Sequence, residues 1–413
     1  AQHHTFTAAD GVKSPKFVNL DMEEYRDLHL TCDAFRQVLM EDEFMSMKAG
    51  IVLQAYLPDS FEVQRCLTDW AKERVSQGGA AIKIRIVKGA NLAMEQVEAS
   101  IHDWEQAPYY TKADVDANYK RMVHYGSQPE NAKVVNLGIA SHNLFEIAYA
   151  MLLRAGHEVE KYVEFEMLEG MANHQARAVR DAVDGLLLYA PVVKKEDFHS
   201  AIAYLVRRLD ENTSEENFLH DLFGMKVGGA SWNKQKEMFL NACRRRDEVS
   251  AVPNRTQNRN TESHELDLEK PFHNEADTDW SLRHNMRWVL QEVENFKNSE
   301  IETVPVQIAG EMHVTSHLET GQDPSRPGVD AYQYSLTDAA GVDKALQCAV
   351  GAQPSWEARG VDARSLICKQ VAVELAKARG HCIATMVLDG GKAAPEADAE
   401  FSEAIDFATY YAD

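Results

Sequence analysis

The sequence predicts an α/β fold whose first half is a parallel sheet closed as a (β/α)8 TIM-type barrel. Three observations support this. Short, nearly continuous apolar runs alternate with longer amphipathic stretches, which is the pattern of a parallel sheet covered by helices. The phosphate-binding GxGxxG motif of an open, doubly wound sheet does not follow the first run. Polar residues stand where the runs end, which in barrels is the face that carries chemistry.

Six of the apolar runs have strand length and are rich in β-branched and aromatic residues. They are 16–21, 50–56, 80–87, 133–140, 162–167 and 185–190. Helical patterns separate them, at 22–39, 60–77 and 143–155. Because a barrel of this type has eight strands, we expect this one to lack its first two strands, which would precede Ala1.

The second half of the sequence lacks this alternation of apolar runs and helical stretches. Residues 244–285 are polar and poor in aliphatic side chains, which indicates an extended connection. A short hairpin is predicted at 306–314, and helices near 338–352 and 362–379, the latter ending at Gly380. We therefore predict three regions: an incomplete barrel over 1–222, an inter-domain connection over 223–303 and an incomplete second domain over 304–413.

Composition excludes some classes of function. The 43 basic and 65 acidic residues give a formal charge of −22, so we expect no nucleic-acid partner. The six cysteines form no CxxC pair, and no metal site or disulfide framework is predicted. No apolar run approaches the roughly 18–20 residues of a membrane span, and the first residues do not resemble a signal peptide. We expect a cytoplasmic protein with at most peripheral membrane contact.

The sharpest motif is a stripe of one predicted helix that carries Tyr204, Arg207, Arg208 and Glu211. These positions are spaced i, i+3, i+4 and i+7, so they share a face. Two guanidinium groups beside a tyrosine suit a carboxylate, because each presents two parallel donors. The alternative is a solvated helix face with Arg–Glu pairs, which is the commoner meaning of such a pattern in isolation.

A second motif is Arg85, Lys88, Gly89 and Ala90 at the end of an apolar run. Two cations followed by glycine suit an anionic or electron-rich ligand that approaches the backbone closely. The alternative is that the cations extend to solvent from a strand end.

Other strand-end residues are weaker candidates, each with a structural alternative. A single histidine after a strand is more often structural than catalytic, and Asp21 is well placed to cap the next helix, although it could also hold an arginine or a substrate amine. These candidates are Asp21, Gln54, Tyr56, Ser141, His142, Asn143, Glu166 and Tyr189.

Taken in order, the strand-end motifs NLD, LQAY, RIVKGA, ASHN, EFE, LYAP and YLVRRxxEN resemble the proline dehydrogenase domain of the bifunctional proline utilization A family, over about residues 14–222. The resemblance implies an FAD-containing barrel that oxidises L-proline to 1-pyrroline-5-carboxylate and passes electrons to a quinone acceptor at the membrane periphery. It also implies site roles. Arg207 and Arg208 would anchor the proline carboxylate, and Glu211 would pair with them.

By the same resemblance, Tyr189 and Tyr204 would form walls of the substrate pocket and Asp21 would support the site. The implied FAD contacts are Gln54, Arg85, Lys88, Gly89, Ala90, Ser141, His142, Asn143 and Glu166, with Thr111 and Lys112 near the outer portion of the cofactor. The chain departs from the family pattern at Asn91 and Leu92, where aromatic residues are common, and at Gly138, where some members carry glutamine. The opening strands, one of which bears an active-site lysine in the family, are not in this sequence.

Residues 354–412 resemble the N-terminal part of aldehyde dehydrogenases. The features are a tryptophan before an arginine-containing helix, LDGGK and EAIDFATYYA. The catalytic cysteine, the general-base glutamate and the NAD-binding sheet of that fold would follow Asp413, so NAD is expected only in a longer enzyme. Cys348, Cys368 and Cys382 have no nucleophile-like context.

Two other functions stay open at this point. An incomplete barrel exposes sheet edges, which would suit a catalytically inert fragment. A non-redox barrel could use Arg207 and Arg208 to capture a carboxylate ligand without any electron transfer. A homo-oligomeric state is also compatible with the sequence.

Overall fold

The structure is a computed structural model that describes residues 5–183, 185–213, 217–222, 224–265, 271–299 and 303–412, without the side chains of 14, 15, 203 and 207–213. Two compact units are present. The first comprises Ala1–Glu98 and Glu105–Asn254, and the second comprises Ala99–Trp104 and Arg255–Asp413. Each is described by itself.

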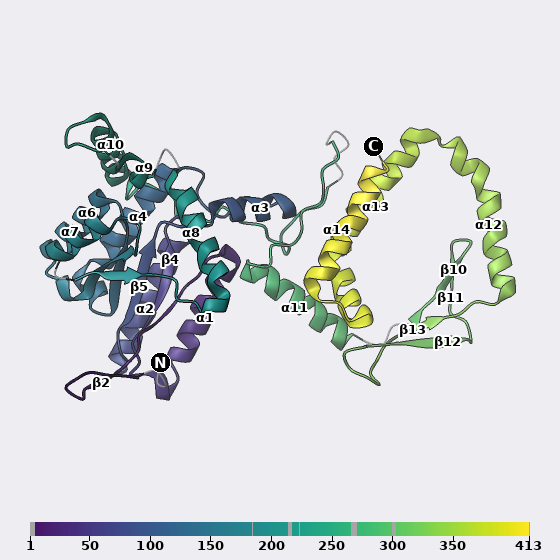
Figure 1. Cartoon of the computed structure of the whole chain (residues 1–413). Coiled ribbons are helices and arrows are strands. Elements are labelled where there is room, and N and C mark those ends of the chain that lie inside the picture. Colours follow the sequence, from purple (N-terminus) through teal and green to yellow (C-terminus); the bar gives the residue numbers. More distant parts are fainter. Residues whose placement is uncertain are drawn as a thin grey trace. The chain divides into compact units, whose positions relative to one another are not determined.

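A parallel sheet of six strands forms the centre of the first unit (Figure 1). The strands are β3 (Val18–Leu20), β4 (Ala49–Gln54), β5 (Ile82–Val87), β6 (Val135–Ala140), β7 (Val163–Leu168) and β8 (Leu187–Tyr189). Each strand pairs with the next one along the chain, all in parallel. This sequential order is that of a (β/α)8 barrel, so the predicted strands and fold class are confirmed. A small hairpin of β1 (Thr5–Thr7) and β2 (Lys13–Pro15) precedes the sheet.

Helices follow the strands, as the alternating pattern predicts. They are α1 (Leu28–Leu39), α2 (Ser60–Ser76), α3 (Leu92–His102), α4 (Lys112–Gly126), α5 (Pro129–Ala132), α6 (Leu144–Gly156), α7 (Asn173–Val183), α8 (Phe198–Thr213), α9 (Phe218–Leu222) and α10 (Ala230–Arg245). Thr111 caps α4 and Asn143 caps α6, each accepting a backbone N–H with its side-chain oxygen.

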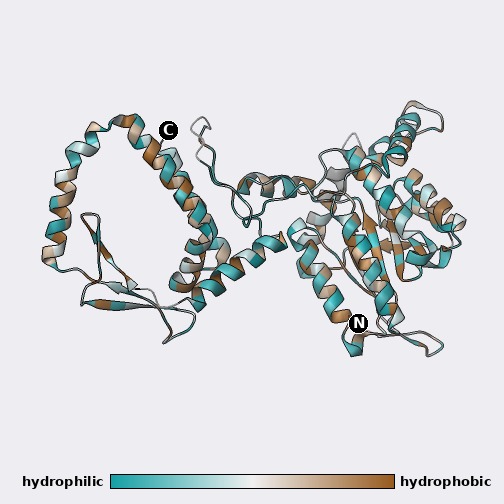
Figure 2. Cartoon of the chain, turned by 180° about the vertical axis from the view of Figure 1, so that it is seen from behind, coloured by the Kyte–Doolittle hydropathy of each residue, from teal (hydrophilic) through white to brown (hydrophobic). Residues whose placement is uncertain are grey.

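The two faces of the sheet differ in chemistry. Ile51, Ile84 and Leu137 are fully buried in one core cluster with side chains of the helices, and the strands stand out as apolar in Figure 2. Burial of such a side chain contributes roughly 1.5–3 kcal/mol. Alternate residues point to the opposite face, which is the barrel interior and carries Lys83 and Arg85. The helices therefore stabilise the sheet, while its inner face is polar.

The helix after β3 begins later than expected. Residues Tyr25–Asp27 form a 3₁₀ turn, and α1 starts at Leu28 with Asp27 at its N-cap position. The suggestion that Asp21 caps this helix is therefore wrong. Its carboxylate accepts the neighbouring N–H of Met22 instead, at 3.1 Å.

The second unit combines helices with small sheets. Its elements are α11 (Arg283–Asn298), β9 (Thr303–Val304), β10 (Val306–Ile308), β11 (Glu311–His313), β12 (Leu318–Gln322), β13 (Asp330–Ser335), α12 (Ala339–Ala358), α13 (Gly360–Gly390) and α14 (Ala394–Tyr410). The predicted hairpin is confirmed as the antiparallel pair β10–β11, turned through Ala309 and Gly310, which both have positive φ. No helix within the described ranges is long and apolar enough to span a bilayer.

The expected helix end at Gly380 is wrong. Helix α13 continues for ten residues beyond it and ends at Gly390, with Gly391 in the left-handed conformation. A Cβ at position 380 would come within 2.8 Å of Glu292 Cγ and 2.9 Å of Trp288 Cζ2, both on α11. The glycine thus permits the close approach of two helices.

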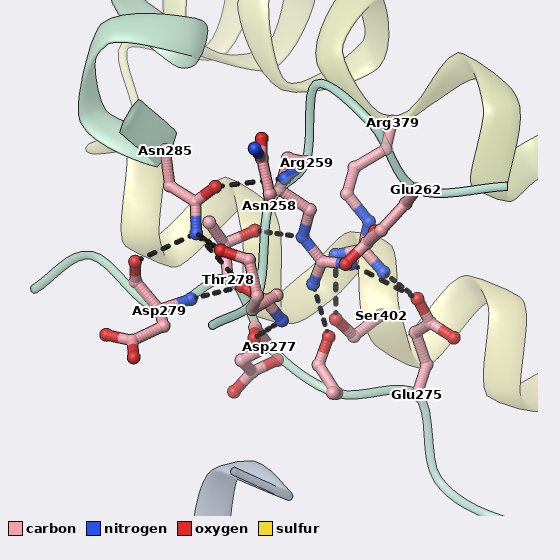
Figure 3. A network of polar contacts seen from close by, with 12 residues as sticks. Asn258, Arg259, Glu262, Glu275, Asp277, Thr278, Asp279, Asn285, Arg379 and Ser402 are labelled. Carbon is pink, nitrogen blue, oxygen red and sulfur yellow. Dashed lines mark hydrogen bonds and ion pairs between the residues drawn. The ribbon is translucent and has the colours of Figure 1, made fainter. Parts of the chain in front are cut away.

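The polar connection contains no helix or strand over the described residues between α10 and α11. Its C-terminal part is held to α13 and α14 by a buried polar network (Figure 3). Arg379 donates to Asp398 at 2.8 Å and to Glu275 at 2.7 Å. The backbone N–H and hydroxyl of Thr278 donate to Asp398 at 2.6 and 2.8 Å. Arg259 donates to the same hydroxyl at 2.9 Å. The polar connection is therefore an integral part of the second unit from Arg255 onward.

Candidate active site

A cavity of about 380 Å³ lies at the carboxyl ends of the barrel strands. This size is in the range of small-molecule sites. It brings together most of the strand-end residues that the sequence singles out. The predicted site residues that line it are Asp21, Gln54, Arg85, Lys88, Gly89, Ala90, Lys112, Ser141, His142, Asn143, Glu166, Tyr189 and Tyr204.

Five predicted residues are not in this set. Tyr56 does not line the cavity, and its ring lies beside Gly89 instead. Thr111 does not line the cavity, because its hydroxyl caps α4 by accepting the N–H of Asp114 at 3.2 Å. The side chains of Arg207, Arg208 and Glu211 lie outside the described residues, although the backbone of α8 is described through Thr213. Their roles stay predictions.

Arg85 is held on the cavity wall by a buried carboxylate. Its Nε lies 2.5 Å from Glu166 Oε2, and Lys83 Nζ lies 2.5 Å from Glu166 Oε1. The Glu166 side chain is 2% exposed. Arg85 donates a hydrogen bond to one oxygen, and Lys83 forms an ion pair with the other, which has no hydrogen-bond partner within the described residues. These two cations explain how a carboxylate is tolerated in the interior.

Lys88 belongs to a second buried charge cluster. Its ammonium lies 2.5 Å from Asp116 and 3.3 Å from Glu146. Burial by itself would lower the pKa of Lys88, but the two carboxylates outweigh it and raise the pKa. The pKa of Lys112 is lowered, mainly by burial and secondly by repulsion from Lys88, although its ammonium lies 2.6 Å from Asp116. Lys88 is therefore a permanent cation at the site.

His142 lines the cavity and has one ring nitrogen without a partner among the described residues. Its Nε2 accepts the backbone N–H of Leu168 at 3.1 Å. Burial lowers the pKa of His142 to about 4, so the ring is neutral at pH 7. Because Nε2 accepts, the proton of the neutral ring is on Nδ1. Within the described part of the chain this buried Nδ1 has no hydrogen-bond partner.

Two tyrosines from separate elements meet at the cavity. Tyr189 ends β8 and Tyr204 lies on α8, with ring centroids 6.3 Å apart. The Arg85 guanidinium lies 5.5 Å from the centroid of the Tyr189 ring, which is a cation–π arrangement. Tyr189 therefore contacts both Arg85 of the strand-end motif RIVKGA and Tyr204 of the helix motif YLVRR.

Several predicted residues also have local structural tasks. Gly89 has φ +129°, and a Cβ there would lie 2.4 Å from the Tyr56 ring, so a neighbouring side chain requires this glycine. The amide of Gln54 donates to the carbonyls of Met22 and Glu23 at 3.0 and 3.2 Å. It therefore shapes the loop that carries Asp21.

Sequence reasoning missed part of the lining. Met22 and Glu23 lie one and two residues after Asp21, and Asn91 follows Ala90, so proximity in sequence could have found them. The residues from the β7–α7 loop and from α9 gave no such signal, because short apolar segments look like ordinary core. The missed lining residues are Met22, Glu23, Val87, Asn91, Ala140, Met167, Leu168, Met171, Asn217, Phe218 and Leu219.

These features define a β/α-barrel protein with a polar ligand site at the carboxyl face of its sheet. The family model described as "Proline dehydrogenase" matches residues 6–221, which is more than half of the chain. The chain belongs to the proline dehydrogenase family. A second model, "Aldehyde dehydrogenase family", matches residues 322–413.

The chain is similar over nearly its whole length to bifunctional relatives. It is 25% identical to the bifunctional protein PutA of Klebsiella aerogenes, over 96% of this chain and 30% of that protein. The solved structure of proline utilization A from Bdellovibrio bacteriovorus aligns with a TM-score of 0.80 and 31% identity, over 96% of this chain and 39% of that one. The structure from Corynebacterium freiburgense aligns with a TM-score of 0.70 and 39% identity, over 96% and 34%. The chain therefore spans about a third of the length of these relatives.

Proposed function

We propose that the first unit binds FAD and oxidises L-proline to 1-pyrroline-5-carboxylate. The observation that carries the proposal is the cavity of a proline dehydrogenase family member that gathers two cations, a neutral histidine donor and two tyrosines. FAD, when bound, would supply the acceptor for the hydride that proline loses from the ring carbon beside its nitrogen.

The residues present fit this cofactor. The buried Nδ1–H of His142 lacks a partner among the described residues, and a flavin offers ring nitrogens and carbonyls that accept hydrogen bonds. Lys88 and Arg85 place positive charge on the same wall. The N-termini of α4 and α6, both longer than three turns, bring Lys112 and Asn143 to the cavity and favour anionic groups.

The remaining residues would bind and orient proline. Arg207 and Arg208 would grip its carboxylate, and Glu211 would hold the arginine stripe. Tyr189 and Tyr204 would enclose the ring, which fixes the reacting carbon in one position. The proline nitrogen must be neutral to release a hydride from the neighbouring carbon, so turnover should rise with pH.

The second unit would serve a coupled reaction. We propose that residues 322–413 belong to an NAD-dependent module that oxidises glutamate semialdehyde, the ring-opened product, to glutamate. The catalytic cysteine of such a module would be supplied by sequence outside this chain. A quinone at the membrane periphery is the proposed electron acceptor for the first reaction, and a cytoplasmic homo-oligomer is the proposed state.

The test is a titration of the chain with FAD and with the proline analogue tetrahydrofuroic acid. We expect about one FAD per chain and a change of the flavin spectrum when the analogue binds. Arg208→Met should abolish analogue binding and dye reduction by proline while FAD remains bound. Arg180→Met is the matched control, because Arg180 is an exposed helix arginine that pairs only with Asp181 in the described structure.

Two results would contradict the proposal. Wild-type chain that folds cooperatively but retains no FAD would favour the inert fragment. Binding of the analogue without any flavin, and without dye reduction, would favour a carboxylate-binding barrel.

A further inference from the structure

The inner face of the barrel has a gap at Gly138 that two charged side chains fill. Gly138 lies on β6, between Arg85 on β5 and Glu164 on β7. A Cβ at this position would lie 2.1 Å from Glu166 Oε1 and 2.8 Å from Lys83 Cε. Strands β5 and β7 are roughly 10 Å apart, because one strand separates them. Lys83 and Glu166 can therefore meet across β6 only because position 138 has no side chain.

The ion pair between Lys83 and Glu166, which this gap permits, adds a second cation to the buried carboxylate that contacts Arg85. The Lys83 side chain is 8% exposed and Glu166 is 2% exposed. Glu166 has one carboxylate, and it is shared between two cations, Lys83 and Arg85. The Lys83 ammonium also contacts Glu164 and lies 5.6 Å from the Phe17 ring centroid. Because Glu164 is 56% exposed, solvent screens its charge far more than that of Glu166.

We propose that Lys83 is a positioning residue that acts through Arg85. Because Lys83 also pairs with the Glu166 carboxylate, Glu166 does not fully neutralise Arg85, which keeps a net positive charge toward the bound flavin. Glu166 would act through Arg85 rather than by contacting the cofactor. With Lys83 present, the buried triad of Lys83, Arg85 and Glu166 carries one net positive charge. Without it, Glu166 would neutralise Arg85. This inference rests on the proposed binding of FAD in the cavity.

A positive charge beside the flavin stabilises its reduced, more negative form. The proposal therefore predicts the sign of two opposite changes. Lys83→Met removes a positive charge and should make the reduction potential of bound FAD more negative. We expect about a tenfold lower equilibrium constant for two-electron reduction, which is about 30 mV. Glu166→Gln removes a negative charge at nearly constant shape and should make the potential more positive.

The experiment measures the midpoint potential of the FAD-loaded chain by equilibration with redox dyes. Lys83→Arg should restore the wild-type potential, because it restores the charge. Lys72→Met is the control, since Lys72 is an exposed lysine of α2 whose partner is Asp69, and it should leave the potential unchanged.

If Lys83 and Glu166 only maintained the shape of the site, both substitutions would shift the midpoint potential of FAD in the same direction. Shifts of Lys83→Met and Glu166→Gln in the same direction, or no shift in either, would overturn the proposal. If Lys83→Met does not retain FAD, then a Glu166→Gln potential at or below the wild-type value overturns it. Failure of the wild-type chain to bind FAD would instead refute the proposed function, so the two failures are distinguishable.

Discussion

Replacement of Arg379 by methionine should loosen the segment 271–279 from helices α13 and α14 of the second unit. Arg379 is 2% exposed and Asp398 is 1% exposed at their side chains, and they form an ion pair at 2.8 Å. Methionine fills a similar volume but leaves Asp398 buried without its cation. The Thr278 bonds remain, yet they are the weaker part of the charge compensation. Breaking a buried pair on one side costs about 3–5 kcal/mol.

Hydrogen exchange read by mass spectrometry is the suitable assay, because it reports the connection separately from the rest of the chain. Peptides that cover 271–279 should exchange faster in Arg379→Met, by a factor of about 100 or more for that free-energy loss. Lys377→Met is the matched control on the same helix. Lys377 is half exposed and pairs with Glu374, and such surface pairs contribute about 0–1 kcal/mol.

Equal exchange of 271–279 in Arg379→Met and Lys377→Met would refute the reasoning, because the buried network would then not hold this segment. Asp398→Asn offers an independent check. It keeps an acceptor for Thr278 but removes the charge, so it should have an effect of the same sign as Arg379→Met.

Further predictions concern His142 and two glycines. The pKa of His142 is about 4 in the folded state, below its ordinary value of about 6.5, so the unfolded chain binds a proton more readily between these values. The neutral His142 side chain therefore contributes to the free energy of unfolding, and this contribution of about 3 kcal/mol is complete above pH 6.5. It is lost as the pH falls toward 4. Urea denaturation at pH 7 and at pH 4.5 should therefore show that His142→Gln loses less stability between the two pH values than the wild-type chain does. An equal loss in both proteins would contradict the low pKa of His142. Gly380→Ala should destabilise the second unit by about 1–3 kcal/mol in denaturant melts through overpacking. Gly351→Ala should not destabilise, because no atom lies within 4 Å of its added Cβ, and equal losses would exclude a packing role for Gly380.

Much of the barrel could be predicted because its determinants are local. A buried parallel strand needs a short apolar run, and a helix needs its own period, so the six strands could be read from consecutive residues. The strand-end residues could be grouped for the same reason, since parallel strands bring their carboxyl ends to one face. His142 and Tyr189 were singled out in this way, and both line the cavity.

The partnerships of charged residues could not be predicted, because they depend on side chains far apart in the chain. Lys83 and Glu166 are on strands that are not neighbours, and nothing near Lys83 indicates its partner. Gly380 was misread for a related reason. A glycine in a helical pattern signals an end when the neighbours are unknown, whereas here the approach of α11 requires it.

By itself, the amino-acid sequence determined the order of the six barrel strands, the residues at the strand ends and the resemblance to two enzyme families, because each is written in contiguous motifs. Only the tertiary structure decided which charges are buried together, which histidine nitrogen carries the proton and why Gly138 has no side chain. These depend on distances between strands and helices, which are set when the whole core packs.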